Sequence, residues 1–147
     1  MVWKPHVTVS AIVEHEQRFL LVEERVDGRM VLNNPAGHLE PGETLLQAVI
    51  RETREEAAWE FTPEAVIGIY QWHHAPRDLT FLRVCYCGAV NGHDPEQHLD
   101  EGIHRTIWMT RDEMLSARER LRSPMVLQAI DDYLAGTRYP LDIIKKL

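Results

Sequence analysis

Short segments rich in β-branched and aromatic residues occupy the N-terminal part of the chain. Val7–Glu14 and Phe19–Glu24 have this composition, which is typical of β-strands. The Asp-Gly pair at Asp27-Gly28 follows the second segment and is a common two-residue turn of β-hairpins. We therefore predict a hairpin in which Phe19–Glu24 pairs with Met30–Leu32.

Three further strands are predicted in the second half of the chain. Two are long, Ala65–Trp72 and Thr80–Val90, and His73–Asp78 forms the turn between them. A shorter strand covers His104–Met109. The segment NNPAGHLEPGE directly follows the first hairpin. It contains two Gly, two Pro and two Asn, a composition that predicts a loop.

Helices are predicted where capping residues precede an apolar pattern. Thr44 with Gln47 three residues later matches a capping box, and Ser123 with Pro124 matches an N-cap followed by proline at the first helical position. The predicted helices run from Thr44 to about Trp59, from Thr110 or Asp112 to about Arg118, and from Pro124 to near Gly136. Strands with interspersed helices indicate an α/β fold in which helices cover a mixed sheet. The apolar tail RYPLDIIKKL is expected to dock on the core.

Size and charge narrow the functional classes. The 147 residues, of which 44% are apolar, suit one domain over residues 1–147 with one sizeable core. A net charge of −7 argues against a nucleic-acid polymer as partner, because such binding depends on Lys and Arg contacts to phosphate. Small phosphorylated molecules remain possible ligands if a divalent cation screens the acids.

The cysteines and the lengths of the apolar runs indicate in which cellular compartment the protein works. Cys85 and Cys87 fall on the same face of one predicted strand, which is a poor geometry for a disulfide, so we interpret them as small core residues. The first apolar run, VTVSAIV, is short and follows Lys4 and His6, unlike a signal peptide. No run reaches the ~18 apolar residues that a membrane helix needs. We expect a cytoplasmic protein with no membrane partner.

The helix that begins at Thr44 has an acidic face beside its core face. Its core stripe consists of Leu46, Ile50, Thr53 and Ala57. Its acidic residues are Glu52, Glu55 and Glu56, whose i, i+3, i+4 spacing makes them neighbours. Clustered carboxylates repel one another, and a Mg²⁺ or Mn²⁺ ion would reverse the sign of that interaction. The alternative is a solvated surface on which nearby arginines neutralise the glutamates.

The preceding loop favours the functional interpretation. Gly37 and Gly42 allow close approach of a ligand, and the loop leads into a helix N-terminus, where free N–H groups attract anions. Counted from Gly37, five residues precede Glu43, and seven more precede the segment RETREEAAW, which starts at Arg51. This arrangement resembles the Nudix box, a motif of Gly, Glu and Arg-Glu-x-x-Glu-Glu at these spacings.

Every charged position of the box is present, and three other positions depart from it. These are Thr53 and Trp59 at aliphatic positions and Ala58 at a glycine position. Because of Ala58 we expect the helix exit to be built differently, with the helix continuing. Segments outside the box, among them KPHVTVSAIV, LRSPMVLQAI and GTRYPLDII, resemble the phosphatase NudJ branch of the family.

The resemblance implies an α/β/α sandwich in which the box forms loop–helix–loop, and a hydrolase of phosphoanhydrides that uses Mg²⁺ or Mn²⁺. It implies metal ligands at Glu52, Glu55 and Glu56, completed by the backbone carbonyl of Ala36 and by a late acidic residue, Glu101. It also implies a supporting ion pair between Glu43 and Arg51, the latter counted with the catalytic machinery. The general base is left open between Glu52 and the loop acids Asp100 and Glu101.

Candidate substrate contacts lie outside the acidic helix face. Arg83 stands among core-type residues of a strand and suggests a phosphate contact, although a snorkelling side chain explains it equally. Trp72 is a candidate for stacking on a ring, Gly37 and His38 border the box, and Arg122 is a further candidate phosphate contact. Each of these residues also has an ordinary structural explanation in the core, at a turn or at a helix start.

The resemblance to the NudJ branch implies release of inorganic phosphate from nucleoside tri- and diphosphates, thiamine diphosphate or hydroxymethylpyrimidine diphosphate. One alternative is a Nudix pyrophosphohydrolase that cuts ADP-ribose or dinucleoside polyphosphates internally. A second is a non-catalytic Nudix domain that senses a nucleotide, which the complete set of box glutamates disfavours. We expect a monomer or weak homodimer.

Overall fold

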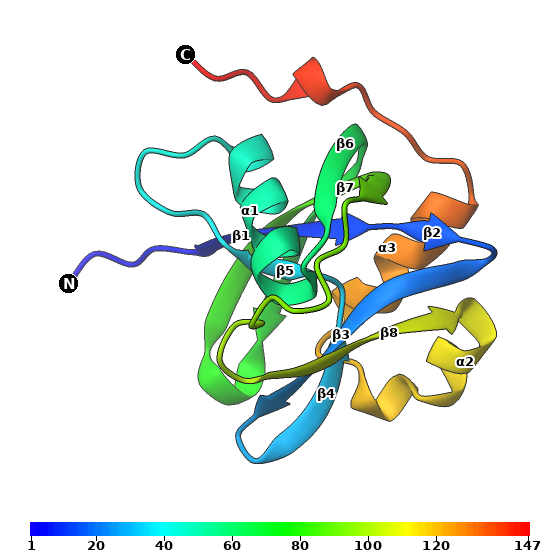
Figure 1. Ribbon diagram of the computed structural model, residues 1–147. Helices are drawn as coiled ribbons and strands as arrows, with labels where there is room; N and C mark the ends of the chain where they lie inside the picture. The colour runs from blue at the N-terminus through cyan, green and yellow to red at the C-terminus, as the bar shows by residue number, and fades with distance from the viewer.

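A computed structural model describes residues 1–147 and contains two β-sheets that lie between helices (Figure 1). The first sheet has the strand order β5-β1-β7-β6. Its strands are β1 (His6–Ile12), β5 (Ala36–His38), β6 (Glu60–His74) and β7 (Leu79–Asn91). Because β1 and β7 run parallel and the other pairs antiparallel, this sheet is mixed, as predicted.

The second sheet is antiparallel and is built around β3. It consists of β2 (Glu14–His15), β3 (Arg18–Val26), β4 (Arg29–Asn33) and β8 (Ile103–Thr110). The predicted hairpin of β3 and β4 is confirmed, and its turn residues Asp27 and Gly28 both have positive φ angles, 50° and 77°. A two-residue turn in which both residues have positive φ angles matches the right-handed twist of the paired strands.

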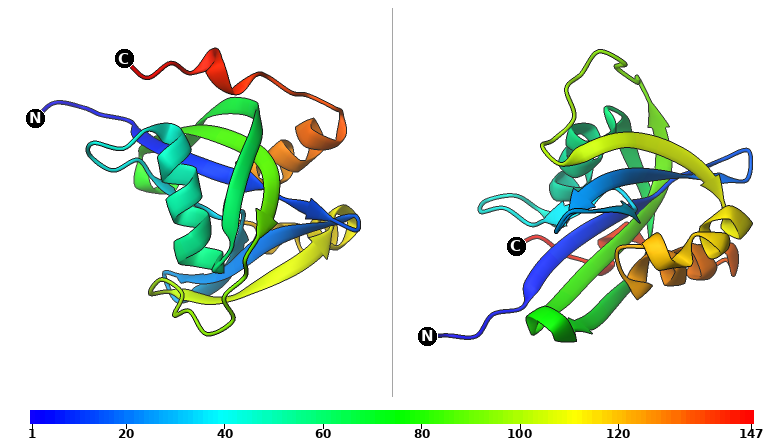
Figure 2. Two further views of the ribbon diagram at one scale, coloured as in Figure 1. Left: turned by 45° about the horizontal axis from the view of Figure 1, so that its top comes forward. Right: turned by 90° about the horizontal axis from the view of Figure 1, so that it is seen from below.

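Helices cover the sheets from two sides, which gives the α/β/α sandwich (Figure 2). Helix α1 (Leu45–Ala57) packs on one side, whereas α2 (Arg111–Ser116) and α3 (Pro124–Leu134) pack on the other. Three 3₁₀ turns cover Ala75–Arg77, Arg118–Arg120 and Leu141–Ile143. None of the helices is long and apolar enough to cross a bilayer.

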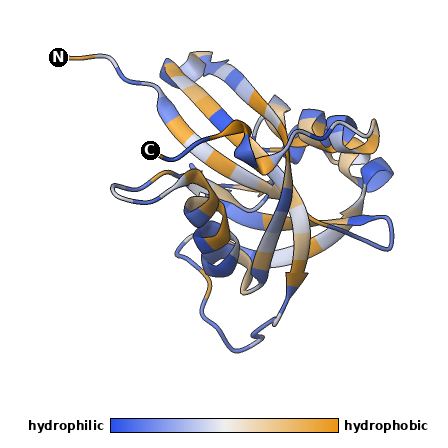
Figure 3. Ribbon diagram, turned by 90° about the horizontal axis from the view of Figure 1, so that it is seen from above, coloured by the Kyte–Doolittle hydropathy of each residue, from blue (hydrophilic) through white to orange (hydrophobic).

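The strands supply two hydrophobic cores through alternation of their side chains, visible as alternating colours in Figure 3. On β7, Val84 and Tyr86 face α1, while Cys85 and Cys87 face α3. Both cysteines are free and buried, as predicted. The C-terminal segment also docks as expected, because Leu141 packs against the α1 side of the core.

Several element boundaries differ from the sequence prediction. Strand β6 begins at Glu60 instead of Ala65, because a bulge at Pro63 lets the ladder with β7 continue past a residue without an N–H group. The predicted loop contains the short strand β5, which pairs with β1. Thr110 is the N-cap of α2, and that helix ends at Ser116 before a 3₁₀ turn.

The end of α1 contradicts the expectation of a continuing helix. The helix ends at Ala57, and Ala58 adopts the left-handed conformation, with φ 59° and ψ 30°. Its N–H group donates to the carbonyl of Arg54, and its own carbonyl accepts from Asp94 at 3.0 Å. Ala58 therefore takes the backbone conformation that glycine usually provides at a helix C-terminus.

Candidate active site

Helix α1 places its three glutamates in different environments. The side chains of Glu52 and Glu56 are largely buried, whereas Glu55 is 40% exposed. Thr53 points into the core, where its hydroxyl donates to the carbonyl of Val49 at 2.8 Å, so its polar group is satisfied within the helix. The helix thus separates an acidic face from a core face, as the spacing predicted.

Strand β5 lies directly against the acidic face of α1. The backbone N–H of Ala36 donates to the Glu56 carboxylate at 2.9 Å. A Cβ atom on Gly37 would stand 2.1 Å from the Glu52 Cδ atom, closer than any real contact. Glycine at position 37 is therefore required by close approach of the Glu52 carboxylate, since its φ angle is not positive.

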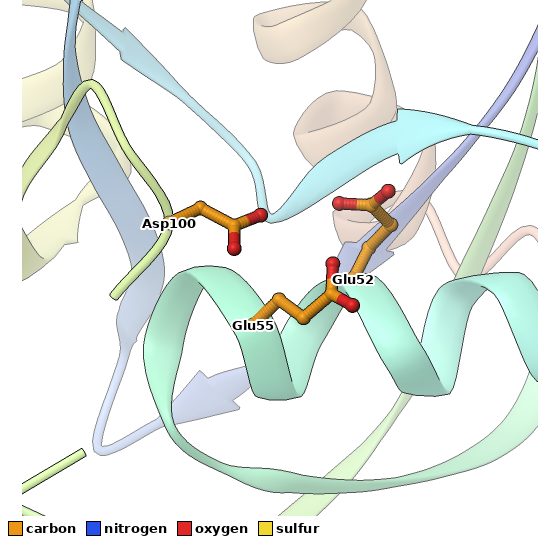
Figure 4. A group of neighbouring side chains, drawn as sticks. All are labelled: Glu52, Glu55 and Asp100. Atoms are coloured by element: carbon orange, nitrogen blue, oxygen red, sulfur yellow. The ribbon is translucent and has the colours of Figure 1, made fainter. Parts of the chain in front are cut away.

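A loop acid joins the helix at this face (Figure 4). Carboxylate oxygens of Glu52, Glu55 and Asp100 lie within 4.8 Å of one another. The backbone N–H of Asp100 donates to the carbonyl of Glu55 at 3.0 Å, which ties the loop to the helix. Glu101 is exposed in the following turn and is not part of this group, so we replace Glu101 by Asp100 as the candidate ligand.

Arg51 connects the box loop with the glutamates. Its guanidinium donates to Glu43 at 2.8 and 3.0 Å, to Glu52 at 2.7 Å and to Glu55 at 3.1 Å, and also to the carbonyl of His38. The ion pair between Glu43 and Arg51 is thus present. The hydrogen bonds from Arg51 lower the pKa of Glu43. Arg54, by contrast, is exposed and pairs with Glu60.

Burial raises the pKa values of the carboxyl groups of Glu52 and Glu56. Removal from water raises the pKa of Glu52 to about 7, against the opposing effect of Arg51. The same cause raises the pKa of Glu56 to about 9. Arg51 alone faces the charge of two of the three α1 carboxylates when they ionise, so the helix face then carries excess negative charge that a cation would compensate.

A cavity of about 370 Å³ opens beside this face. Arg83, Trp72, Gly37 and His38, which were named as candidate substrate contacts, all line it, as does Arg122. Other lining residues were not found from the sequence, because they come from distant strands and a helix start and carry no local motif: Thr8, Glu24, Asn33 and Ser123. The cavity lining thus contains both carboxylates, such as Glu52 and Glu56, and the guanidinium groups of two arginines.

The two arginines differ in their partners. Arg122 donates to Glu24 at 2.7 Å. Arg83 is 6% exposed, and its Nε and Nη1 atoms have no hydrogen-bond partner. Burial lowers the pKa of Arg83 from its ordinary value. Most of the guanidinium is therefore out of water, with Nε and Nη1 fully buried.

Aromatic rings border the cavity along the edge of the first sheet. Trp72 stacks on Phe81 with 5.8 Å between ring centroids, and Phe81 lies 5.3 Å from the ring of His6. A second hollow of about 480 Å³ adjoins the cavity and shares Trp72, Arg122 and Ser123 with it. Trp72 therefore stands between the two hollows.

Comparison with known proteins agrees with this geometry. A model of the NUDIX domain family matches residues 4–129. The chain therefore belongs to the Nudix family and is a Nudix hydrolase, an enzyme that hydrolyses phosphoanhydrides. Members of this family generally use a divalent metal.

One curated relative and two solved structures show how similar this chain is to individual members of the family. The chain is 42% identical over 142 residues to "Phosphatase NudJ" of Escherichia coli strain K12, covering 97% of this chain and 92% of the relative. A "NUDIX hydrolase from Nitrosomonas europaea" superimposes with a TM-score of 0.96 at 47% identity, over 98% of each chain. A MutT NUDIX hydrolase from Burkholderia pseudomallei shares the fold, with a TM-score of 0.72 at 18% identity over 88% of this chain and 98% of that one.

Proposed function

We propose that this Nudix hydrolase releases inorganic phosphate from nucleoside tri- and diphosphates, thiamine diphosphate or hydroxymethylpyrimidine diphosphate. The observation that carries the proposal is a single cavity that joins the acidic face of α1 to two arginines. Carboxylates that bind a cation, together with guanidinium groups in the same cavity, suit the charged end of a phosphoanhydride. A relative whose name is phosphatase, 42% identical over most of the chain, supports release of phosphate.

The residues present fit a Mg²⁺ or Mn²⁺ ion. The available donors are hard carboxylate oxygens, three of which already lie within 4.8 Å of one another, and Gly37 lets the Glu52 carboxylate lie directly against β5. Glu52, Glu55, Glu56 and the Ala36 carbonyl would hold the ion, with Asp100 as a further ligand. Such an ion neutralises phosphate oxygens and lowers the pKa of water.

The protein's own groups supply binding and proton transfer. Glu52 is the stronger candidate for the general base, because burial brings its pKa to about 7, near the pH at which a base is most effective. Asp100 is the alternative at the same group. Arg51 counts with the catalytic machinery because it holds Glu52 and Glu55 in place.

Substrate contacts follow from the lining of the two hollows. Arg83 and Arg122 face the phosphates, and Trp72 offers its ring to the heteroaromatic part of the leaving group. Gly37 and His38 border the phosphate path. Burial beside His6, Arg122 and Arg83 lowers the pKa of His38, so its imidazole is neutral at pH 7 and does not add charge.

Product analysis tests this function. Purified protein with Mg²⁺ is incubated with cytidine triphosphate, cytidine diphosphate, thiamine diphosphate and the pyrimidine diphosphate, and the products are separated by ion-exchange chromatography. We expect orthophosphate as the inorganic product. Pyrophosphate from the triphosphate would indicate internal cleavage instead. Glu56→Gln is expected to abolish turnover while circular dichroism stays unchanged, and near-full activity would refute the metal assignment.

We propose one Nudix domain over residues 1–147 that works in the cytoplasm as a monomer or weak homodimer and does not bind nucleic-acid polymers. The net charge of −7 and the two free cysteines support this proposal. Light scattering on the purified protein measures the oligomeric state, and a tight higher oligomer would contradict it.

A further inference from the structure

Three strands contribute buried polar side chains to the cavity. Thr8 of β1 and Arg83 of β7 are direct neighbours in the parallel pair, and Asn33 ends β4. All three residues line the cavity and are less than 7% exposed. Thr8 Oγ1, Asn33 Oδ1 and both Nε and Nη1 of Arg83 have no hydrogen-bond partner within the protein.

A buried guanidinium without a partner is unusual, because a charge removed from water is costly unless an opposite charge or acceptor meets it. Glu24, one of the nearby carboxylates, is already engaged by Arg122. Glu56 accepts from the N–H of Ala36. The unsatisfied donors of Arg83 therefore indicate a ligand that brings its own acceptor oxygens and negative charge.

The strands close the cavity behind these residues. The next residues on the same face of β1 and β7 are Ser10 and Cys85, and both are fully buried. Neither residue lines the cavity, so a group that contacts Arg83 meets buried side chains in this direction along the strands. The start of α3 at Ser123 also lies at this cavity, where the N-terminus of an 11-residue helix favours anions.

We propose that Arg83, Thr8 and Asn33 form a blind-ended subsite for a terminal phosphoryl group, which restricts hydrolysis to phosphoanhydrides with a free phosphate end. This inference rests on the proposed function and deepens it. Glu52 and Glu56 line the same cavity as these residues. A diphosphate esterified at both ends would have to place its second substituent where buried side chains stand.

The reaction at this subsite is a simple hydrolysis. Water forms a new bond to the terminal phosphorus and gives one proton to the carboxylate base. The bond from that phosphorus to the bridging oxygen breaks, and the oxygen leaves with the electron pair on the shortened phosphate. Orthophosphate remains against Arg83 until it is released.

A matched pair of substrates tests the blind end. Cytidine diphosphate and its β-methyl ester differ only by a methyl group on the terminal phosphate. We expect the wild type to hydrolyse cytidine diphosphate with a kcat/KM at least 100-fold higher than that of the ester. Arg83→Met is expected to lower kcat/KM for cytidine diphosphate at least 100-fold and to reduce this preference below 10-fold. Arg29→Met, at an exposed hairpin position, is the control and should behave as wild type.

Phosphate binding provides a second readout that needs neither metal nor turnover. In EDTA, 10 mM inorganic phosphate should raise the Tm of the wild type but not of Arg83→Met. The variant alone should unfold at the same or a higher temperature than the wild type, because it removes a buried unpaired charge. If it fails to fold, Thr8→Val takes its place, with an expected loss of at least 10-fold in kcat/KM for cytidine diphosphate.

The outcomes separate the two proposals. Equal hydrolysis of cytidine diphosphate and its methyl ester by the wild type would overturn the blind end while leaving phosphoanhydride hydrolysis intact. An unchanged preference in Arg83→Met, with phosphate still raising its Tm, would overturn the role of Arg83. Failure of the wild type to release orthophosphate from cytidine diphosphate would instead refute the proposed function, and the subsite would fall with it.

Discussion

Replacement of Glu56 by Gln is expected to stabilise the metal-free protein. The Glu56 side chain is 9% exposed, and burial raises its pKa to about 9 from an ordinary value of 4.5. A glutamine of the same shape can still accept the hydrogen bond from Ala36 through its Oε1 atom. The variant therefore removes the cost of a buried acid and keeps the contact that holds β5 to α1.

The sign and size of the effect follow from proton linkage. Between pH 4.5 and 9 the folded protein retains the Glu56 proton and the unfolded chain releases it, so the stability of the wild type falls as pH rises. The slope is about 1.4 kcal/mol per pH unit, which makes a difference of about 3.5 kcal/mol at pH 7 an upper bound. Below pH 4.5 both states carry the proton, and the two proteins should be equally stable.

Urea unfolding in EDTA measures this difference. Wild type, Glu56→Gln and the exposed control Glu96→Gln are unfolded at pH 5, 6, 7 and 8, with linear extrapolation of the free energy of unfolding. We expect the gap between Glu56→Gln and wild type to widen with pH and the control to follow the wild type. Equal stability at pH 7, or a variant less stable than the wild type, would refute the assignment of Glu56 as a strained buried acid.

Three further variants test other parts of the site. Gly37→Ala should lower kcat at least 100-fold with an unchanged circular dichroism spectrum, because its Cβ would displace the Glu52 carboxylate; wild-type kcat would contradict this. Trp72→Ala should raise KM about 10-fold for cytidine diphosphate but not for methyl diphosphate, which has no ring to stack on Trp72. The exposed variant Gln71→Ala is the control, and an equal effect of Trp72→Ala on both substrates would exclude ring stacking. Ala58→Gly should raise the free energy of unfolding by about 0.5–1 kcal/mol in urea titrations, because glycine adopts the left-handed backbone conformation without strain. A loss of stability would show that the methyl group of Ala58 stabilises the fold by more than this strain costs.

Local periodicity was enough to predict the acidic face of α1. Glu52 and Glu56 share a face because of helix geometry alone, so their spacing together with the glycine loop indicated the site. Arg83 was also recognisable, as a charge within an apolar strand. Features that depend on neighbours in space were not predictable in this way, such as the unpartnered hydroxyl of Thr8 at the closed end of the cavity.

The errors have the same origin. Asp100 joins the glutamates in place of Glu101 because a backbone hydrogen bond to Glu55 fixes the loop, and no sequence rule distinguishes two adjacent acids. The end of α1 was predicted wrongly because alanine normally continues a helix. Here the bond from Asp94 to the Ala58 carbonyl, together with burial, holds Ala58 in a conformation that it rarely adopts alone.

We infer that the acidic face of α1 binds the divalent cation on which hydrolysis depends. Crystals grown with Mn²⁺ at a concentration that supports full turnover, and measured at a wavelength where manganese scatters anomalously, test it most directly. We expect an anomalous peak within coordination distance of carboxylate oxygens of Glu52 and Glu56, absent in crystals of Glu56→Gln. A map with no peak at these glutamates, or with its only peak elsewhere, would contradict it.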